Sequence, residues 1–203
     1  MRFEFFTLLV YSPRGSSKNA INSRKLMGVC KNGDATFANK VAHKIQEINK
    51  NNYFYNSALI PAPRSAPLAK GAVLPTRVLA ECLINNGLGN VVYECIQRIV
   101  PIPKSSSQYT AETRNSVQTH LESLKVESMM IAEPTLIIID DVLTLGRTTM
   151  ACAIKLKEIY PNKEIKIFCP FRTRSFEDKN ILVDVRCGST ITLSPNGKVI
   201  LPD

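Results

Sequence analysis

Hydrophobic residues recur in two patterns along the chain, and each pattern predicts a different kind of element. Short, nearly continuous apolar runs bounded by proline or polar residues are typical of strands buried on both faces of a parallel sheet. They lie at residues 3–11, 57–60, 91–96 and 136–139. Apolar residues spaced every three or four positions predict helices instead. Such stretches lie at residues 37–48, 76–86, 111–121 and 151–159. The alternation predicts an α/β protein with a central, mostly parallel sheet.

The segments between these elements carry turn residues. Residues 12–23 are rich in Ser and Asn and include Pro13 and Gly15, so they are expected to form a loop. A second turn, at residues 31–34, ends in Asp34, a residue type that caps helices. Near the end of the chain, the sequence Pro-Asn-Gly at 195–197 predicts a β-hairpin.

These elements fit a single domain over residues 1–203, because the chain is long enough for one well-formed core. Within it we expect an N-terminal strand and helix (1–56), a core (57–170) and a C-terminal extension (171–203). The extension could form a hood over a ligand or simply add strands at the edge of the sheet, and both interpretations stay open.

The strongest candidate for chemistry follows the apolar run at 136–139. Asp140 and Asp141 fall at the carboxyl end of this predicted strand, and ligands of open α/β sheets bind outside the strand ends. Residues 144–149 then lead into a predicted helix, so their N–H groups would point out of a helix N-terminus, where phosphate binds readily. The plainer alternative is a buried strand in which Asp141 only caps the next element.

Two carboxylates beside a phosphate need hydroxyl or cationic partners. Ribose hydroxyls and a Mg²⁺ ion held by pyrophosphate would supply both, since Mg²⁺ keeps several waters and uses few protein carboxylates. Other phosphate sites fit less well. No Gly-x-x-x-x-Gly-Lys-Ser/Thr motif occurs, and Gly87 and Gly89 lack the third glycine of a dinucleotide site because Val92 stands there.

A second phosphate contact is predicted in the proline-rich loop after residues 57–60. Four residues there offer a guanidinium fork, a hydroxyl, an ammonium group and a flexible backbone position suited to pyrophosphate. They are Arg64, Ser65, Lys70 and Gly71. Judged alone, this loop could equally be a plain connection.

Residues 138–148 resemble the phosphoribosyl-pyrophosphate (PRPP) signature of the type I phosphoribosyltransferases. The resemblance implies their three-layer fold, with Asp140 and Asp141 as the catalytic pair that holds the ribose hydroxyls and could bind Mg²⁺ through water. It places the 5′-phosphate at Leu143, Thr144, Leu145, Gly146, Arg147, Thr148 and Thr149. Pyrophosphate would bind at the proline-rich loop. Leu145 departs from the family, which usually has a small or hydroxyl residue there.

The segment between these two loops resembles the ComF-like branch of the family. Its pattern of Arg98, Ser107-Gln108, Arg114-Asn115 and Leu121 matches that branch in order and spacing. A flexible lid is expected at Lys104, Ser107, Gln108, Arg114 and Asn115. An ordinary exposed loop explains the serine run equally well. Two features depart from this branch: the paired cysteines of its N-terminal zinc ribbon are absent, and residues 72–75 differ from its usual sequence.

Composition changes this picture little. The net charge of +9 favours anionic partners, and nucleic acid stays open as one although no RNP, helix-turn-helix or zinc-finger pattern accompanies the charge. Six scattered cysteines without a Cys-x-x-Cys pair predict reduced thiols. The apolar run at 3–11 is too short to span a membrane, so a cytoplasmic protein without a membrane partner is expected.

The leading hypothesis is therefore a phosphoribosyltransferase that uses PRPP and Mg²⁺, transfers the phosphoribosyl group to a nitrogen acceptor and releases pyrophosphate. A homodimer is compatible with the resemblance, because many relatives dimerise. The alternative is a non-catalytic PRPP- or nucleotide-binding module, regulatory or accessory to competence, that could associate with nucleic acid.

Overall fold

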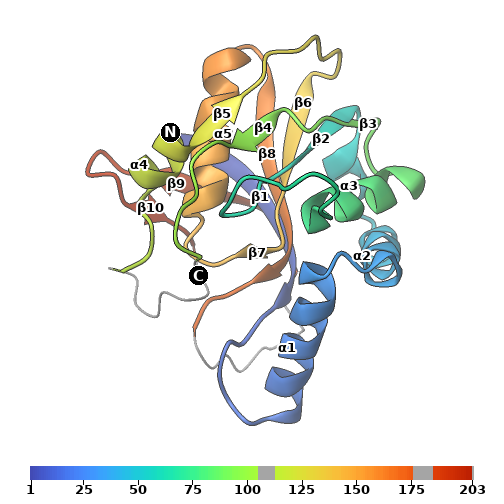
Figure 1. Ribbon diagram of the computed structural model, residues 1–203. Helices are drawn as coiled ribbons and strands as arrows, with labels where there is room; N and C mark the ends of the chain where they lie inside the picture. The colour runs from blue at the N-terminus through green and yellow to red at the C-terminus, as the bar shows by residue number, and fades with distance from the viewer. Residues whose placement is uncertain (105–112, 176–184, 203) are drawn as a thin grey trace.

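The structure, a computed structural model, describes residues 1–104, 113–175 and 185–202. It confirms the predicted α/β class: a mostly parallel sheet of eight strands has helices on both faces (Figure 1). The strand order is β10-β9-β1-β8-β6-β2-β3, with β7 beside β8. The strands are β1 (Arg2–Val10), β2 (Ser57–Pro61), β3 (Val91–Val92), β6 (Thr135–Ile139), β7 (Val142–Leu143), β8 (Glu164–Arg172), β9 (Arg186–Leu193) and β10 (Val199–Ile200).

The other described elements cover this sheet. A separate antiparallel pair consists of β4 (Ile96–Arg98) and β5 (Leu124–Val126). The helices are α1 (Lys18–Lys31), α2 (Ala35–Glu47), the short 3₁₀ helix η1 (Asn51–Phe54), α3 (Pro75–Asn85), α4 (Val117–Ser123) and α5 (Arg147–Ile159).

β6 lies at the centre of the sheet, as the apolar run predicted. It pairs in parallel with β2 on one side and with β8 on the other. Alternate side chains of a strand point to opposite faces, and here both faces are covered. Leu136 and Ile138 pack with α5, whereas Ile137 and Ile139 pack with α2 and α3. All four are completely buried. Asp140 is thus the first polar position after the apolar residues 136–139 of β6.

Two hydrophobic clusters separate the three layers. One lies between the sheet and α4, α5 and the β4–β5 pair; the other lies between the sheet and α1, α2, α3 and η1. In the second cluster the ring of Phe6 packs against Tyr53 and Phe168, with centroids 5.3 and 5.2 Å apart. The Tyr53 hydroxyl also donates to the Ile167 carbonyl at 2.8 Å, so its polar end is satisfied inside the core.

Helix α1 corrects the predicted loop at 12–23, because the chain is helical from Lys18 onward. The Ser17 side chain caps it by accepting from the Ala20 N–H at 3.2 Å. Arg24 then donates to the carbonyls of Arg14 (3.0 Å) and Gly15 (2.8 Å), which fastens the preceding loop to the helix. Polar tertiary contacts stabilise α1, so its apolar periodicity is weak and did not reveal it.

Two further predictions were wrong in extent. The expected strand at 91–96 is divided: β3 joins the central sheet and β4 pairs with β5. The expected helix at 111–121 begins only at Val117, after Ser116 accepts from the Thr119 N–H at 3.0 Å. Residues 105–112 lie outside the described part of the chain.

The C-terminal hairpin is confirmed, with β9 and β10 antiparallel and Gly197 at a φ of 78° in the turn. β9 pairs antiparallel with β1, so the described part of this extension adds strands to the edge of the sheet. The cysteines are free thiols, as expected. Among the described residues, no helix is long and apolar enough to cross a membrane.

The burial of β6 predicts the effect of truncating it. Ile138→Ala should lower the free energy of unfolding by about 3 kcal/mol, because it leaves a cavity in a fully buried site. Denaturant unfolding followed by circular dichroism measures this change. The control is Met130→Ala, whose side chain is 96% exposed and whose substitution should change stability by less than about 0.5 kcal/mol. Equal losses in both variants would contradict the central placement of β6.

Candidate functional site

A cavity of about 340 Å³ lies at the carboxyl ends of β2 and β6. It is bounded by the loop after β2, the start of α3, the end of β4 with the segment after it, the residues before α4, His120 of α4, the β6–α5 connection and the last residue of α1. Thirteen of the residues singled out in the sequence line it. They are Arg64, Ser65, Lys104, Arg114, Asn115, Asp140, Asp141, Thr144, Leu145, Gly146, Arg147, Thr148 and Thr149.

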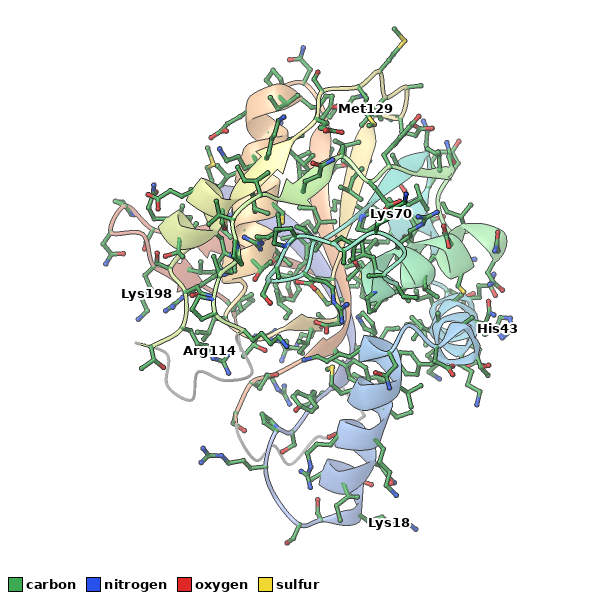
Figure 2. The ribbon with its side chains drawn as sticks, in the orientation of Figure 1. Lys18, His43, Lys70, Arg114, Met129 and Lys198 are labelled. Atoms are coloured by element: carbon green, nitrogen blue, oxygen red, sulfur yellow. The ribbon has the colours of Figure 1, made fainter. Side chains whose placement is uncertain are left out.

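The structure does not bring all the predicted residues together. Lys70 and Gly71 are exposed and do not line the cavity; Figure 2 shows Lys70 and Arg114 on separate loops. Leu143 is completely buried in the core instead. Its side chain therefore cannot contact a phosphate in the cavity. Ser107 and Gln108, the centre of the expected lid, lie outside the described residues.

The lining residues that were missing from the predicted site include three with basic side chains: Lys31, Arg98 and His120. Lys31 ends the helix that the sequence pattern did not reveal. Arg98 was noted only as part of a family pattern. His120 lies three residues after Val117 on the buried side of α4, a spacing that is visible in the sequence but does not distinguish a core histidine from a functional one.

The two aspartates are held in an environment that disfavours their charge. Asp140 donates its backbone N–H to the Phe168 carbonyl at 3.0 Å, and its carboxylate accepts from the Asp141 N–H at 2.9 Å. Burial and the neighbouring Asp141 charge raise the pKa of Asp140 to about 8. Burial also raises the pKa of Asp141, against the opposing charge of Lys31, whose Nζ lies 3.8 Å from Oδ2. Such a pair is stabilised by a ligand that brings hydroxyl donors or positive charge.

The N-terminus of α5 attracts negative charge, in contrast to the acid pair. Gly146 precedes the helix with a φ of 66°, and an added Cβ there would collide with Ile191 of β9. The first bond within the helix runs from the Met150 N–H to the Gly146 carbonyl at 2.9 Å. The N–H groups of residues 147–149 precede that bond, so they are the unsatisfied donors of a helix start. This end of the cavity suits an anion.

The threonine hydroxyls of this turn differ in their partners. Thr149 donates to the Gly146 carbonyl at 3.1 Å, so its hydroxyl caps the turn. The Thr144 hydroxyl lies 3.2 Å from that of Thr173. Thr148 is half-buried, lines the cavity and lies beside His120, with 3.5 Å between Oγ1 and Nε2.

Arg147 anchors a neighbouring segment as well as adding charge. Its Nη1 donates to the carbonyls of Arg114 at 2.8 Å and Asn115 at 3.3 Å. Asn115 in turn donates from Nδ2 to the Pro103 carbonyl at 2.8 Å. The residues on either side of segment 105–112 are therefore tied together at the cavity rim.

Arg98 connects three elements beneath the cavity. It is only 4% exposed, and burial lowers its pKa from the ordinary value. Its Nε donates to the Arg64 carbonyl at 3.0 Å and its Nη1 to the hydroxyl of Ser123. The Ile102 N–H also donates to the Ser65 carbonyl at 2.8 Å. These bonds fasten the proline-rich loop to β4 and α4.

Positive charge dominates the lining. Six cationic side chains face two carboxylates there, and such a cavity attracts a polyanion. The cations are Lys31, Arg64, Arg98, Lys104, Arg114 and Arg147. Among the described residues, no group of three or more His, Cys, Asp or Glu side chains could hold a metal ion alone.

No family model matches the sequence, and no curated protein matches it.

The raised pKa of Asp140 predicts how stability changes with pH. An unfolded aspartate ionises near pH 3.9, whereas folded Asp140 keeps its proton to about pH 8. The unfolded state thus binds fewer protons between these values, and stability should fall as pH rises from 4 to 8. Asp140→Asn should flatten this fall, as measured by denaturant unfolding at a series of pH values.

The control for this experiment is Glu158→Gln, because its carboxylate is exposed on α5, away from the cavity. This variant should retain the wild-type slope. An unchanged slope in Asp140→Asn would show that Asp140 ionises in the folded state as it does in the unfolded state.

Proposed function

We propose that the protein is a phosphoribosyltransferase of the type I fold, which binds PRPP with Mg²⁺ and transfers its phosphoribosyl group to a nitrogen acceptor. One observation carries the proposal. A single cavity joins a desolvated acid pair to an uncapped helix N-terminus and to six cations. PRPP needs all three, since it combines a hydroxyl-bearing sugar with phosphate groups at two ends.

The arrangement supports a specific orientation of PRPP. The 5′-phosphate binds at the N–H groups of residues 147–149 and the hydroxyl of Thr148. Asp140 and Asp141 accept hydrogen bonds from the ribose hydroxyls. Pyrophosphate lies toward Arg64 and Ser65. The volume of about 340 Å³ is at the lower end of the roughly 300–1,000 Å³ of small-molecule sites.

The residues present fit a Mg²⁺ ion that arrives with the substrate. Asp140 and Asp141 offer oxygen ligands, directly or through water, but too few for a site made of protein alone. When bound, Mg²⁺ neutralises charge on the pyrophosphate. Its arrival would also stabilise the ionised form of the acid pair, which burial disfavours.

In the proposed reaction the bond between the ribose C1 and the pyrophosphate oxygen breaks, and the acceptor nitrogen bonds to C1 and loses its proton. Positive charge develops on the sugar and negative charge on the leaving group. The acid pair stabilises the first, and the cations around Arg64 stabilise the second. The protein otherwise holds the reactants in position.

Removing both carboxylates tests the ribose site. The double variant Asp140→Asn with Asp141→Asn should bind PRPP with Mg²⁺ at least about tenfold more weakly in calorimetry, because the ribose hydroxyls lose charged acceptors. Asp34→Asn is the matched control: it makes the same change at the cap of α2, outside the cavity, and asparagine caps equally well. Unchanged affinity in the double variant would remove these residues from the site.

Turnover is tested separately from binding. Wild-type protein incubated with PRPP, Mg²⁺ and a panel of nitrogenous bases should release pyrophosphate with at least one base, as followed by a coupled phosphate assay. Tight binding of PRPP without release on any acceptor would favour the non-catalytic alternative. Absence of PRPP binding would reject the phosphoribosyltransferase and a PRPP-binding module alike, and would leave only a nucleotide-binding module from the alternative.

A further inference from the structure

His120 has no part in the proposed binding of PRPP, yet it occupies a central place beneath the cavity. It comes from α4, is only 4% exposed, and lies between Arg98 of β4 and Thr148 of α5. The Nη2 of Arg98 is 3.4 Å from its Nδ1, and the Oγ1 of Thr148 is 3.5 Å from its Nε2. One ring thus connects a buried cation to the helix N-terminus that faces the ligand.

The chemistry of Arg98 decides which ring nitrogen carries the proton. A guanidinium group donates hydrogen bonds and accepts none. Its Nε and Nη1 are already directed to the Arg64 carbonyl and the Ser123 hydroxyl, which fixes the plane of the group. The Nδ1 of His120 must therefore accept from Nη2. A neutral imidazole has one N–H, so the proton lies on Nε2.

The Nε2–H in turn orients the hydroxyl of Thr148. When Oγ1 accepts from Nε2, its own proton is left to donate elsewhere. Among the described residues, His120 is the one hydrogen-bond partner of this hydroxyl, and Thr148 lines the cavity. The neighbouring Thr149 differs, because its hydroxyl donates back to the Gly146 carbonyl.

We propose that His120 is a positioning residue for the anion site: Arg98 fixes its tautomer, and its Nε2–H holds the Thr148 hydroxyl so that this hydroxyl donates to a phosphate group at the start of α5. The inference deepens the proposed function, on which it rests for the identity of the phosphate ligand. It needs only that a phosphate group binds at α5.

The electrostatic surroundings of His120 agree with this role. Burial, and then the charges of Arg98 and Arg147, lower its pKa to about 4. Both charged groups that act on the ring, one from β4 and one from α5, favour its neutral form. The ring therefore keeps a single tautomer throughout the neutral pH range. A protonated ring would instead lose its acceptor for Arg98.

The tautomer is tested directly on the wild-type protein by ¹⁵N NMR of the imidazole nitrogens. The chain has only two histidines, and the other, His43, is exposed on α2 (Figure 2), so the His120 signals are assigned by their loss in His120→Asn. We expect an unprotonated Nδ1 and a protonated Nε2. A proton on Nδ1 overturns the inference, whatever the ligand.

The functional link is tested with a double-mutant cycle on inorganic phosphate binding. His120→Asn keeps an amide oxygen near the Nδ1 position for Arg98 but cannot reach Thr148, whereas Thr148→Val removes the hydroxyl. Each variant should weaken phosphate binding about tenfold, and the double variant should be no weaker than Thr148→Val alone. Thr148→Ser should restore the affinity. Losses that multiply in the double variant overturn the inference.

A matched control and a second ligand separate the remaining outcomes. Thr119→Val removes a hydroxyl from α4 that does not line the cavity, so it should leave phosphate affinity unchanged. If the cycle shows coupling for phosphate but PRPP with Mg²⁺ does not bind, the inference holds and the proposed function fails. If PRPP with Mg²⁺ binds and the cycle shows no coupling, the inference about His120 fails and the proposed function stands. If the wild-type protein binds neither phosphate nor PRPP, the inference and the proposed function are both overturned.

Discussion

The site depends on the burial of β6 on both faces. Its neighbours β2 and β8 form hydrogen bonds with its backbone, and helices pack against both of its faces. Every side chain from Leu136 to Ile139 is therefore apolar. The first place where the chain can carry charge is the end of the strand. Parallel pairing also brings the loop after β2 to the same edge of the sheet. The acid pair and the proline-rich loop therefore lie together although they are far apart in the sequence.

Placing two carboxylates at this buried strand end is electrostatically unfavourable, which explains why the other charged side chains of the cavity lining are cations. Two adjacent carboxylates are held where burial raises their pKa values, and within the described part of the chain only Lys31 lies close enough to form an ion pair with them. Around them are cations whose hydrogen bonds hold loops together: Arg98 fastens the proline-rich loop, and Arg147 fastens residues 114 and 115. The protein therefore maintains separated positive and negative regions, an arrangement that favours a ligand with hydroxyls, phosphates and an accompanying cation.

Local sequence patterns predicted the elements whose stability comes from regular apolar spacing. Strand β6 and helix α2 have such spacing and were found within one or two residues. Helix α1 was missed because polar bonds from Arg24 and to the buried Ser23 hydroxyl stabilise it, and these depend on a loop folded against it. The run at 91–96 was read as one strand, although its second half turns away to pair with β5, a partner nearly thirty residues later.

By itself, the sequence determined the acid pair after a buried strand and the glycine before a helix, because both follow from the order of neighbouring residues. Tertiary structure alone decided which side chains join them. It placed Lys31 and His120 at the cavity, left Lys70 and Gly71 outside, and gave Arg147 carbonyl partners from residues 114 and 115. The physical reason is that a side chain's partners across the fold are set by packing between distant segments, which no local spacing records.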